Sequence, residues 1–370
     1  MNNKPVLSVF ASFSGAGGVE RMLINLIRGF VDLGQQVELV LVRERSPHLR
    51  RLPPEVEQVR LGVEHTQLAA PALARYLRRR RPAALLAAKD RAGRTAVIAR
   101  AIAGTGTPIA LRLGTNLATA MADRGALQRW LRYTPIRLLY PHIERIIAVS
   151  AGVADDTARI SRVDPTRITV IRNPVITPEL AQQAALPCPH PWLGEGQPPV
   201  IIGAGRFQRQ KAFPDLIRAF ARMPDRTDHR LMILGEGTGR PALESLIDSL
   251  GLGGSVALPG FQTNPYPFLS RAGLFVLSSA WEGSPNVLTE AMALGTPVVS
   301  TDCPSGPAEI LDGGRYGPLV PVGDVDALAG AMAATLDRPL PAETLRAAVA
   351  EYEQGRSAAH YLETIGLAGR

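Results

Sequence analysis

The sequence predicts an α/β protein made of two doubly wound, Rossmann-like domains, and three observations support this prediction. A chain of 370 residues is longer than one ordinary domain, so about two are expected. Short apolar stretches alternate with longer amphipathic stretches along most of the chain, which is typical of mostly parallel sheets with helices on both faces. This alternation stops between Pro174 and Pro199, where seven prolines fall, and then begins again.

These observations place a first domain at residues 1–175, a proline-rich linker at 176–199 and a second domain at 200–344. The final helices, about residues 345–370, could cap the second domain or cross back onto the first. The apolar run 5–13 follows Lys4 and raises the question of a signal peptide. The run is short and leads through Gly15 straight into an amphipathic stretch, so we interpret it as the first strand.

The elements follow in order along the chain. In the first domain the strands are expected at residues 6–10, 37–42, 84–88, 109–112 and 146–149, with helices at 19–33, 68–81, 92–103 and 127–140, the last with a break near Pro135. In the second domain the strands are expected at 200–204, 231–234, 256–258, 274–277 and 298–299, with helices at 213–223, 240–250, 266–272, 287–294, 325–336 and 341–368. Ligands bind such sheets at the carboxyl ends of the strands, so the cleft between the two domains is the expected site.

Charge and composition narrow the function classes. Residues 1–185 carry 27 Lys and Arg against 14 Asp and Glu, whereas residues 186–370 carry 14 against 19. No apolar run reaches the roughly 18 residues needed to span a bilayer. The two cysteines form no disulfide framework, which fits a reducing cytoplasm. No nucleic-acid recognition motif accompanies the arginines, so a nucleic-acid partner is disfavoured.

The most informative feature is the pair Glu282 and Glu290, eight residues apart in the stretch 274–300. Glu282 is expected on the loop after a buried strand, and Glu290 just inside the next helix. The first N–H groups of that helix lie between them and suit a diphosphate, while carboxylates on either side can accept hydrogen bonds from sugar hydroxyls. An exposed helix with two ordinary surface glutamates would show the same spacing.

Other loops at predicted strand ends carry basic residues and glycines. Arg206 and Lys211 precede a helix and can reach a diphosphate, although they could equally be solvated loop charges. Gly205 and Gly235 would let the backbone approach a ligand closely. Phe261 could border a planar base or belong to the core.

Glycines also connect the first strand to the first helix. Gly17 and Gly18 suit a phosphate or sugar approaching the backbone. A dinucleotide fingerprint would need glycine where Glu20 stands, so that match fails by one position.

Two weaker sequence patterns each allow two interpretations. Asp324 and Asp326 resemble a metal-binding pair, but aspartate is common at helix starts, so no metal site is predicted. Arg129, Arg132, Arg137 and Arg145 alternate with apolar residues and suit contact with a membrane surface, or else form a solvated helix face.

Taken together, the sequence resembles the retaining GT-B glycosyltransferases of family four, also called group 1, of the bacterial polysaccharide and lipid-linked oligosaccharide type. The resemblance covers almost the whole chain. The matching segments are residues 14–21 (SGAGGVER), 146–150 (IIAVS), 172–174 (RNP), 203–220 (GAGRFQRQKAFPDLIRAF), 234–240 (LGEGTGR), 258–261 (LPGF), 264–266 (NPY) and 278–311 (SSAWEGSPNVLTEAMALGTPVVSTDCPSGPAEIL). The last segment is highly specific.

The resemblance implies a role for each matching position. Arg206 and Lys211 match the phosphate-binding pair, Glu282 the acidic residue near the donor sugar, and Glu290 the residue that holds the ribose hydroxyls. Ser284, Pro285, Asn286 and Val287 match the backbone turn at the diphosphate, and Gly17 and Gly18 match the N-terminal glycine loop. Family members need no metal and no cofactor, and they retain the anomeric configuration with the leaving phosphate as base.

One loop departs from the family. Many members carry a histidine after the fourth or fifth strand of the first domain, where this chain has residues 112–116, RLGTN. Arg112, Thr115 and Asn116 are therefore candidate substrate contacts, and Thr115 or Asn116 could take over a hydrogen bond to the donor sugar.

The sequence thus predicts a cytoplasmic, metal-independent, retaining hexosyltransferase with a GT-B fold, whose first domain receives the acceptor. The donor is expected to be a UDP-sugar, with GDP left open, and the acceptor a glycan or lipid-linked precursor of a cell-surface polysaccharide such as lipopolysaccharide. Peripheral contact with the inner face of the cytoplasmic membrane is expected through the basic first domain. The alternatives are a GT-B sugar-nucleotide epimerase, a sugar-nucleotide binding protein without activity, and a nicotinamide-dependent oxidoreductase, which Glu20 disfavours.

Overall fold

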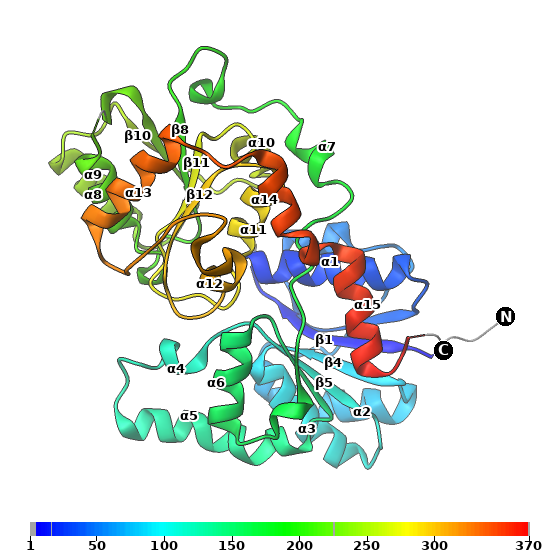
Figure 1. Ribbon diagram of the computed structural model, residues 1–370. Coiled ribbons are helices and arrows are strands. Elements are labelled where there is room, and N and C mark those ends of the chain that lie inside the picture. Colours follow the sequence, from blue (N-terminus) through cyan, green and yellow to red (C-terminus); the bar gives the residue numbers. More distant parts are fainter. Residues whose placement is uncertain (1–4, 16, 225, 369–370) are drawn as a thin grey trace. The chain divides into compact units, whose positions relative to one another are not determined.

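The computed structural model describes residues 5–15, 17–224 and 226–368, so Ala16 of the glycine loop lies outside the described residues (Figure 1). The chain forms two compact units. The first comprises Met1–Val175 together with Tyr352–Arg370, and the second comprises Ile176–Glu351.

The first unit is built on a seven-stranded sheet with the order β3-β2-β1-β4-β5-β6-β7. All the pairings between its described strands are parallel. The strands are β1 (Leu7–Phe13), β2 (Val37–Glu44), β3 (Glu57–Arg60), β4 (Ala84–Ala88), β5 (Ile109–Leu113), β6 (Arg145–Ala148) and β7 (Ile168–Val170). The strand order reverses between β1 and β4, as in doubly wound folds.

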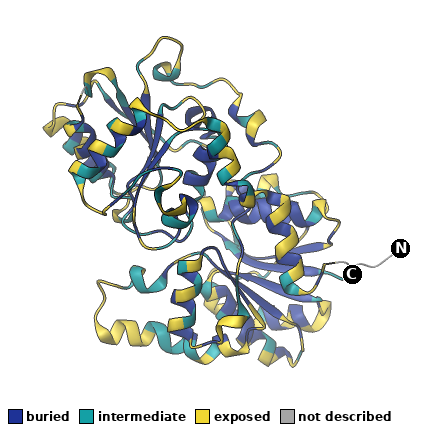
Figure 2. Ribbon diagram, viewed as in Figure 1, coloured by how far each residue is buried: buried dark blue, intermediate teal, exposed yellow. Residues whose placement is uncertain are grey.

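Helices cover both faces of this sheet because successive strand residues point to opposite sides. Leu85 faces one core and Leu86 the other. The first core includes α2 (Ala70–Arg80), α3 (Asp90–Ala103), α5 (Ala126–Leu139) and α6 (Ala151–Ser161), and the second includes α1 (Gly18–Asp32) and α15 (Gln354–Ile365). The central strands β1, β2, β4 and β5 are largely buried, whereas the outward helix faces are exposed (Figure 2).

The C-terminal helix α15 belongs to the first unit and lies beside α1 (Figure 1). The two helices approach closely at Gly29, where a Cβ atom would lie 2.8 Å from Cβ of Ala358. The side-chain amide of Gln354 donates a hydrogen bond to Asp32. The helix before it, α14 (Ala342–Ala348), belongs to the second unit and contacts α11 (Asn286–Ala293) of that unit.

The second unit has a six-stranded sheet with the order β10-β9-β8-β11-β12-β13, again with parallel pairings between described strands. Its strands are β8 (Val200–Ala204), β9 (Arg230–Leu234), β10 (Val256–Gly260), β11 (Leu274–Leu277), β12 (Val298–Thr301) and β13 (Leu319–Val320). Its helices are α7 (Leu180–Ala184), α8 (Phe213–Arg222), α9 (Arg240–Ser249), α10 (Tyr266–Leu269), α11 (Asn286–Ala293), α12 (Pro307–Ile310), α13 (Val325–Asp337) and α14. Helices α8, α9 and α13 share one core, while α11 contacts β11 and β12.

Residues 176–199, expected as a linker, belong to this second unit and contain α7. Helix α7 packs against α10, and the side chain of Asn264 donates to the backbone oxygen of Gln183 at 3.0 Å. The proline-rich segment is thus irregular, and it packs against the rest of the second unit.

Three short strands, β3, β7 and β13, were not among the expected elements, nor were helix α6 and the short helices α4 (Leu117–Ala120), α7 and α12. The predicted break at Pro135 was wrong, since α5 runs unbroken through it. Proline removes the amide that would bond the carbonyl of Leu131, but Leu131 is exposed and water can satisfy that oxygen.

Candidate active site

Backbone hydrogen bonds connect the loops that follow four strands of the second sheet, at the edge formed by the carboxyl ends of these strands. The sheet places β8 between β9 and β11, so residues distant in sequence meet there. The amide of Gly205 donates to the carbonyl of Leu234 at 2.9 Å, and the amide of Gly235 donates to that of Gly260 at 2.9 Å. The amide of Ala280 donates to the carbonyl of Gln210 at 2.8 Å.

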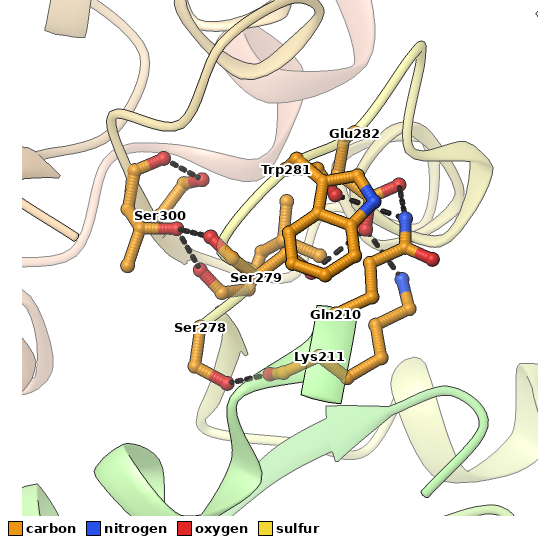
Figure 3. A network of polar contacts seen from close by, with 9 residues as sticks. Gln210, Lys211, Ser278, Ser279, Trp281, Glu282 and Ser300 are labelled. Atoms are coloured by element: carbon orange, nitrogen blue, oxygen red, sulfur yellow. Dashed lines mark hydrogen bonds and ion pairs between the residues drawn. The ribbon is translucent and has the colours of Figure 1, made fainter. Parts of the chain in front are cut away.

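Glu282 and Lys211 form an ion pair at the centre of this edge (Figure 3). Nζ of Lys211 lies 2.6 Å from Oε1 of Glu282. The same oxygen accepts a hydrogen bond from the Ser279 hydroxyl at 2.7 Å, and the Gln210 amide approaches Oε2 at 3.4 Å. Glu282 is only 8% exposed, so its charge depends on these partners.

The backbone around the pair is fixed as well. The Ser278 hydroxyl donates to the carbonyl of Lys211 at 2.7 Å, and the Thr301 hydroxyl donates to that of Ser279 at 2.6 Å. The first bond holds the segment after β11 against the loop that carries Lys211 (Figure 3), and the second holds the same segment against β12.

Two predicted glycines are required by close approach. A Cβ atom on Gly205 would lie 2.7 Å from Cε of Lys211, so the lysine stem packs directly over this backbone. A Cβ atom on Gly235 would lie 1.9 Å from the carbonyl oxygen of Gly205. Both residues also have positive φ, +156° and +147°, which favours glycine.

Helix α11 begins beside Glu282, through a turn of Ser284 and Pro285. Pro285 is the N-cap, and its carbonyl accepts the amide of Leu288 at 3.0 Å. The amides of Asn286 and Val287 belong to the first turn, where helix geometry supplies no intrahelical acceptor. Glu290 lies one turn into α11 and is 2% exposed. The structure therefore places a helix N-terminus between the two glutamates, as expected from their spacing.

The remaining predicted residues of this unit lie at its surface. Arg206 is exposed, and among the described residues it forms no ion pair. Phe261 is 49% exposed, which removes the alternative that it is a core residue.

The glycine loop of the first unit is locked by Glu20. The Glu20 carboxylate accepts the amide of Gly17 at 3.1 Å and caps α1, which begins at Gly18. Its other oxygen lies 3.9 Å from Nζ of Lys89. Glu20, which stands where a dinucleotide fingerprint requires glycine, thus fixes the conformation of the glycine loop.

A cavity of about 440 Å³ opens at the carboxyl ends of β1, β4 and β5, and Arg112 and Thr115 line it. Arg112 is 2% exposed, and its Nη2 atom donates to Oδ1 of Asn173 at 2.7 Å. Burial lowers the pKa of the Arg112 guanidinium from its usual value. Asn116 is buried and caps α4 (Leu117–Ala120), since its Oδ1 accepts the amide of Thr119 at 3.0 Å.

Two family models match the chain. The model described as Glycosyltransferase Family 4 matches residues 16–178, and the one described as Glycosyl transferases group 1 matches residues 198–338. Together they cover most of the chain. The chain belongs to the group 1 and family 4 glycosyltransferases.

Relatives of this glycosyltransferase include a Campylobacter jejuni N-acetylgalactosamine-N,N'-diacetylbacillosaminyl-diphospho-undecaprenol 4-alpha-N-acetylgalactosaminyltransferase. It is 34% identical over 191 residues, which are 50% of this chain and 49% of the relative. The matched stretches span about half or less of the length of the curated relatives.

Solved structures share the fold at low identity. The lipopolysaccharide outer core galactosyltransferase WaaB superposes with a TM-score of 0.72 at 19% identity, covering 98% of this chain and 99% of that one. HepE of Anabaena in complex with UDP superposes with a TM-score of 0.75 at 19% identity, with the same coverage. The fold of this glycosyltransferase is GT-B, as predicted.

In this glycosyltransferase the aspartates considered for metal binding serve other contacts. Asp324 caps α13 by accepting the amide of Ala327 at 2.9 Å, and Asp326 pairs with Arg222 at 2.8 Å. Within residues 5–15, 17–224 and 226–368, no three His, Cys, Asp or Glu side chains gather as a metal site.

Sequence reasoning missed Gln210, Ser279 and Lys89. Gln210 and Ser279 sit next to predicted site residues, but glutamine and serine are common in loops and carried no separate signal. The thiol of Cys303 also lies near the pair, and burial followed by the charge of Glu282 raises its pKa to about 12, so it stays protonated at neutral pH.

Proposed function

We propose that this glycosyltransferase moves a sugar from a UDP-sugar to a glycan or lipid-linked acceptor in cell-surface polysaccharide synthesis. The observation that carries the proposal is the Lys211–Glu282 pair beside the first turn of α11. It offers a cation and helix amides to a diphosphate, and carboxylate oxygens to sugar hydroxyls, within one set of loops.

Each residue is assigned to the part of the donor that it would bind. Lys211, Arg206 and the backbone of residues 284–287 bind the diphosphate. Glu290 accepts hydrogen bonds from the ribose hydroxyls, and Glu282 from the donor sugar. Exposed Phe261 lies against the base, where an aromatic ring and a planar base gain contact area.

We further propose that transfer proceeds with retention and without a metal ion. The acceptor oxygen forms its bond to the anomeric carbon on the face from which the diphosphate departs. The bond between that carbon and the leaving phosphate oxygen breaks, and the acceptor proton passes to a phosphate oxygen. Lys211, Arg206 and the α11 amides stabilise the charge that develops on the diphosphate.

Printed names of similar proteins support the donor and acceptor classes. HepE was solved with UDP and with UDP-glucose, and TarM of S. aureus with UDP. The C. jejuni relative is named for a diphospho-undecaprenol substrate, and an Escherichia coli relative is a lipopolysaccharide 1,6-galactosyltransferase.

Product analysis tests the proposal against its rivals. The protein is incubated with UDP-sugars and membrane or glycan acceptors, and the nucleotide products are separated. Free UDP accompanied by a glycosylated acceptor is expected. An epimerase would leave the nucleotide attached to a changed sugar, and a binding protein would change neither.

A second part of the proposal concerns the membrane. Helix α5 exposes an apolar stripe, with Leu127 68%, Trp130 56% and Leu131 57% exposed. These residues recur at helical spacing on one face, and Arg129 flanks them. An apolar stripe with tryptophan and arginine suits an anionic membrane surface.

Not all of the predicted basic cluster is available for this contact. Arg132 pairs with Asp90 at 2.7 Å, and Arg137 donates to the carbonyl of Ile160 at 3.1 Å. Arg145 is exposed but lies on β6. We place the enzyme at the inner face of the cytoplasmic membrane through α5. None of the described helices has the length and apolar character to cross a bilayer.

A further inference from the structure

Arg240, the first residue of α9, uses all three nitrogens of its guanidinium group on neighbours within the second unit. Nε and Nη2 donate to the two carboxylate oxygens of Glu236 at 3.1 and 2.8 Å. Nη2 also donates to the carbonyl of Leu258 at 2.9 Å, and Nη1 donates to Glu244 at 2.8 Å. The guanidinium lies over the ring of Phe207, with 5.7 Å between Cζ and the ring centroid. A planar fork that bonds both oxygens of one carboxylate fixes direction as well as distance.

Apart from Glu244, which lies on α9 itself, these neighbours come from three different strands. Phe207 follows β8, Glu236 follows β9, and Leu258 lies near the end of β10. The sheet order β10-β9-β8 places these strands side by side. Arg240 therefore connects the carboxyl ends of all three.

The loop after β8 is held through its backbone as well. The amide of Phe207 donates to the carbonyl of Glu236 at 2.9 Å, and the amide of Gly239 donates to the carbonyl of Phe207 at 3.0 Å. A Cβ atom on Gly237 would lie 2.7 Å from that same carbonyl oxygen of Phe207. Arg206, the exposed cation assigned to the diphosphate, directly precedes buried Phe207, so this backbone decides where its side chain begins.

The end of β10 packs against the same ion pair. Gly260 has φ +86°, and a Cβ atom there would lie 3.2 Å from Oε1 of Glu236 and 4.0 Å from Nη2 of Arg240. Its carbonyl accepts the amide of Gly235 at 2.9 Å. Phe261, the exposed aromatic residue assigned to the base, comes next in the chain. The pair of Glu236 and Arg240 thus lies against the backbone that presents Phe261.

We propose that Arg240 is a positioning residue for the nucleotide, because it fixes the separation between Arg206 at the diphosphate end and Phe261 at the base end. The inference rests on the proposed function and adds to it the residue that joins the two binding segments. Arg240 itself makes no bond to the donor, since each of its nitrogens already donates to a neighbour. Segments held at a fixed separation bind both ends of one ligand without first having to be ordered.

The two glutamates bonded to Arg240 offer a matched comparison. Each lies four residues from Arg240, each side chain is 50% exposed, and each has an oxygen 2.8 Å from the guanidinium. The pair with Glu244 is an ordinary contact along one helix, and such exposed pairs contribute little to stability. The pair with Glu236 differs only in that it ties the helix to the loop after β9.

The test is calorimetric titration of the full chain with UDP. Glu236→Ala is expected to weaken UDP binding about tenfold, the factor that corresponds to one charge-assisted bond, because it releases the loop after β9 from Arg240. Glu244→Ala is expected to bind UDP like wild type, because the three strand ends stay connected. Equal UDP affinity in the two variants would overturn the proposal.

Arg240→Met examines the arginine itself, and inorganic pyrophosphate separates positioning from direct contact. UDP affinity should fall about tenfold or more, whereas pyrophosphate affinity should change less than about twofold, because a ligand that occupies one end does not depend on the separation. Equal loss for both ligands would mean that Arg240 binds phosphate itself and would overturn the proposal. Arg222→Met is the control, since it removes a cation from another exposed ion pair of the same unit.

Arg240→Lys keeps the charge but loses the planar fork. It should bind UDP as weakly as Arg240→Met, and full recovery of UDP affinity would assign the effect to charge alone and count against the proposal. Melting temperatures show whether each variant folds. If Arg240→Met does not fold, the comparison of Glu236→Ala with Glu244→Ala decides. Failure of wild type to bind UDP would instead contradict the proposed function.

Discussion

Nζ of Lys211 lies 2.6 Å from Oε1 of Glu282, although 71 residues separate them in the chain. The residue assigned to the donor phosphate and the residue assigned to the donor sugar are therefore direct partners in the structure. An incoming diphosphate would share Lys211 with Glu282, which couples recognition of the sugar to recognition of the phosphates.

The first prediction separates the two phosphate cations. Arg206→Ala and Lys211→Ala should each weaken UDP binding roughly ten- to hundredfold, because a charge-assisted contact contributes about 1.5–3 kcal/mol. Lys211→Ala should be the more severe, since it also leaves the buried Glu282 carboxylate without its cation beside the diphosphate. Calorimetric titration with UDP measures both.

Adding Glu282→Gln to Lys211→Ala should recover part of the lost affinity and stability, because it removes the uncompensated charge. Circular dichroism serves as the control that both single variants are folded. Unchanged UDP affinity in both folded variants would contradict the assignment.

The second prediction concerns the glutamates. Glu290→Gln should mainly weaken nucleotide binding, because ribose is common to the donor and to UDP. Glu282→Gln should mainly lower turnover and relax the choice of donor sugar while UDP still binds. Steady-state kinetics and UDP titration of both variants provide the comparison, and loss of UDP binding in Glu282→Gln alone would reverse the two roles.

The third prediction tests how Lys211 is held. Gly205→Ala should displace the lysine stem, since its new Cβ would meet Cε at 2.7 Å, and should lower UDP affinity by about tenfold or more. Gly254→Ala is the matched control, because nothing lies within 4 Å of a Cβ there. Equal UDP affinity in the two variants would show that Lys211 tolerates the shift.

The fourth prediction concerns metal ions. Transferase activity should persist in excess chelator, because Arg206, Lys211 and the start of α11 are assigned the positive charge that the diphosphate requires. The assay compares initial rates with and without EDTA. Complete loss of rate that Mg²⁺ or Mn²⁺ restores would reject metal-independent transfer.

The fifth prediction concerns α5. The protein should float with anionic vesicles at low salt and be released by salt, since each basic residue near such a surface contributes about 1 kcal/mol within a Debye length. Trp130→Ser/Leu131→Ser should abolish flotation by removing the apolar stripe. Leu250→Ser/Leu340→Ser, exposed apolar residues of the second unit, is the control and should float normally. A wild-type protein that floats with neither anionic nor neutral vesicles would leave α5 without this role.

Much of the architecture could be predicted because local sequence patterns indicate where helices and strands begin and end. The strands at 84–88, 200–204 and 274–277 have the predicted limits, and most helices begin and end within two residues of expectation. Apolar periodicity and glycine or proline at element ends are local signals. The strands β3 and β7 were not predicted because they are short and carry polar or half-buried residues. Both lie at the edge of the sheet, where a strand has only one neighbouring strand.

By itself, the sequence determined the candidate residues for donor binding, namely Lys211, Glu282, Glu290 and the turn before α11, whose roles stay predictions. Only the tertiary structure decided which of them touch. Lys211 follows β8 and Glu282 follows β11, and these strands become neighbours through the sheet order, which no local pattern specifies. Burial is equally non-local: Arg112 sits in an apolar strand, and only the packing of α15 and the Asn173 loop around the sheet made it a buried cation without an acid beside it. Periodicity is set by neighbours along the chain, whereas pairing and desolvation are set by neighbours in space.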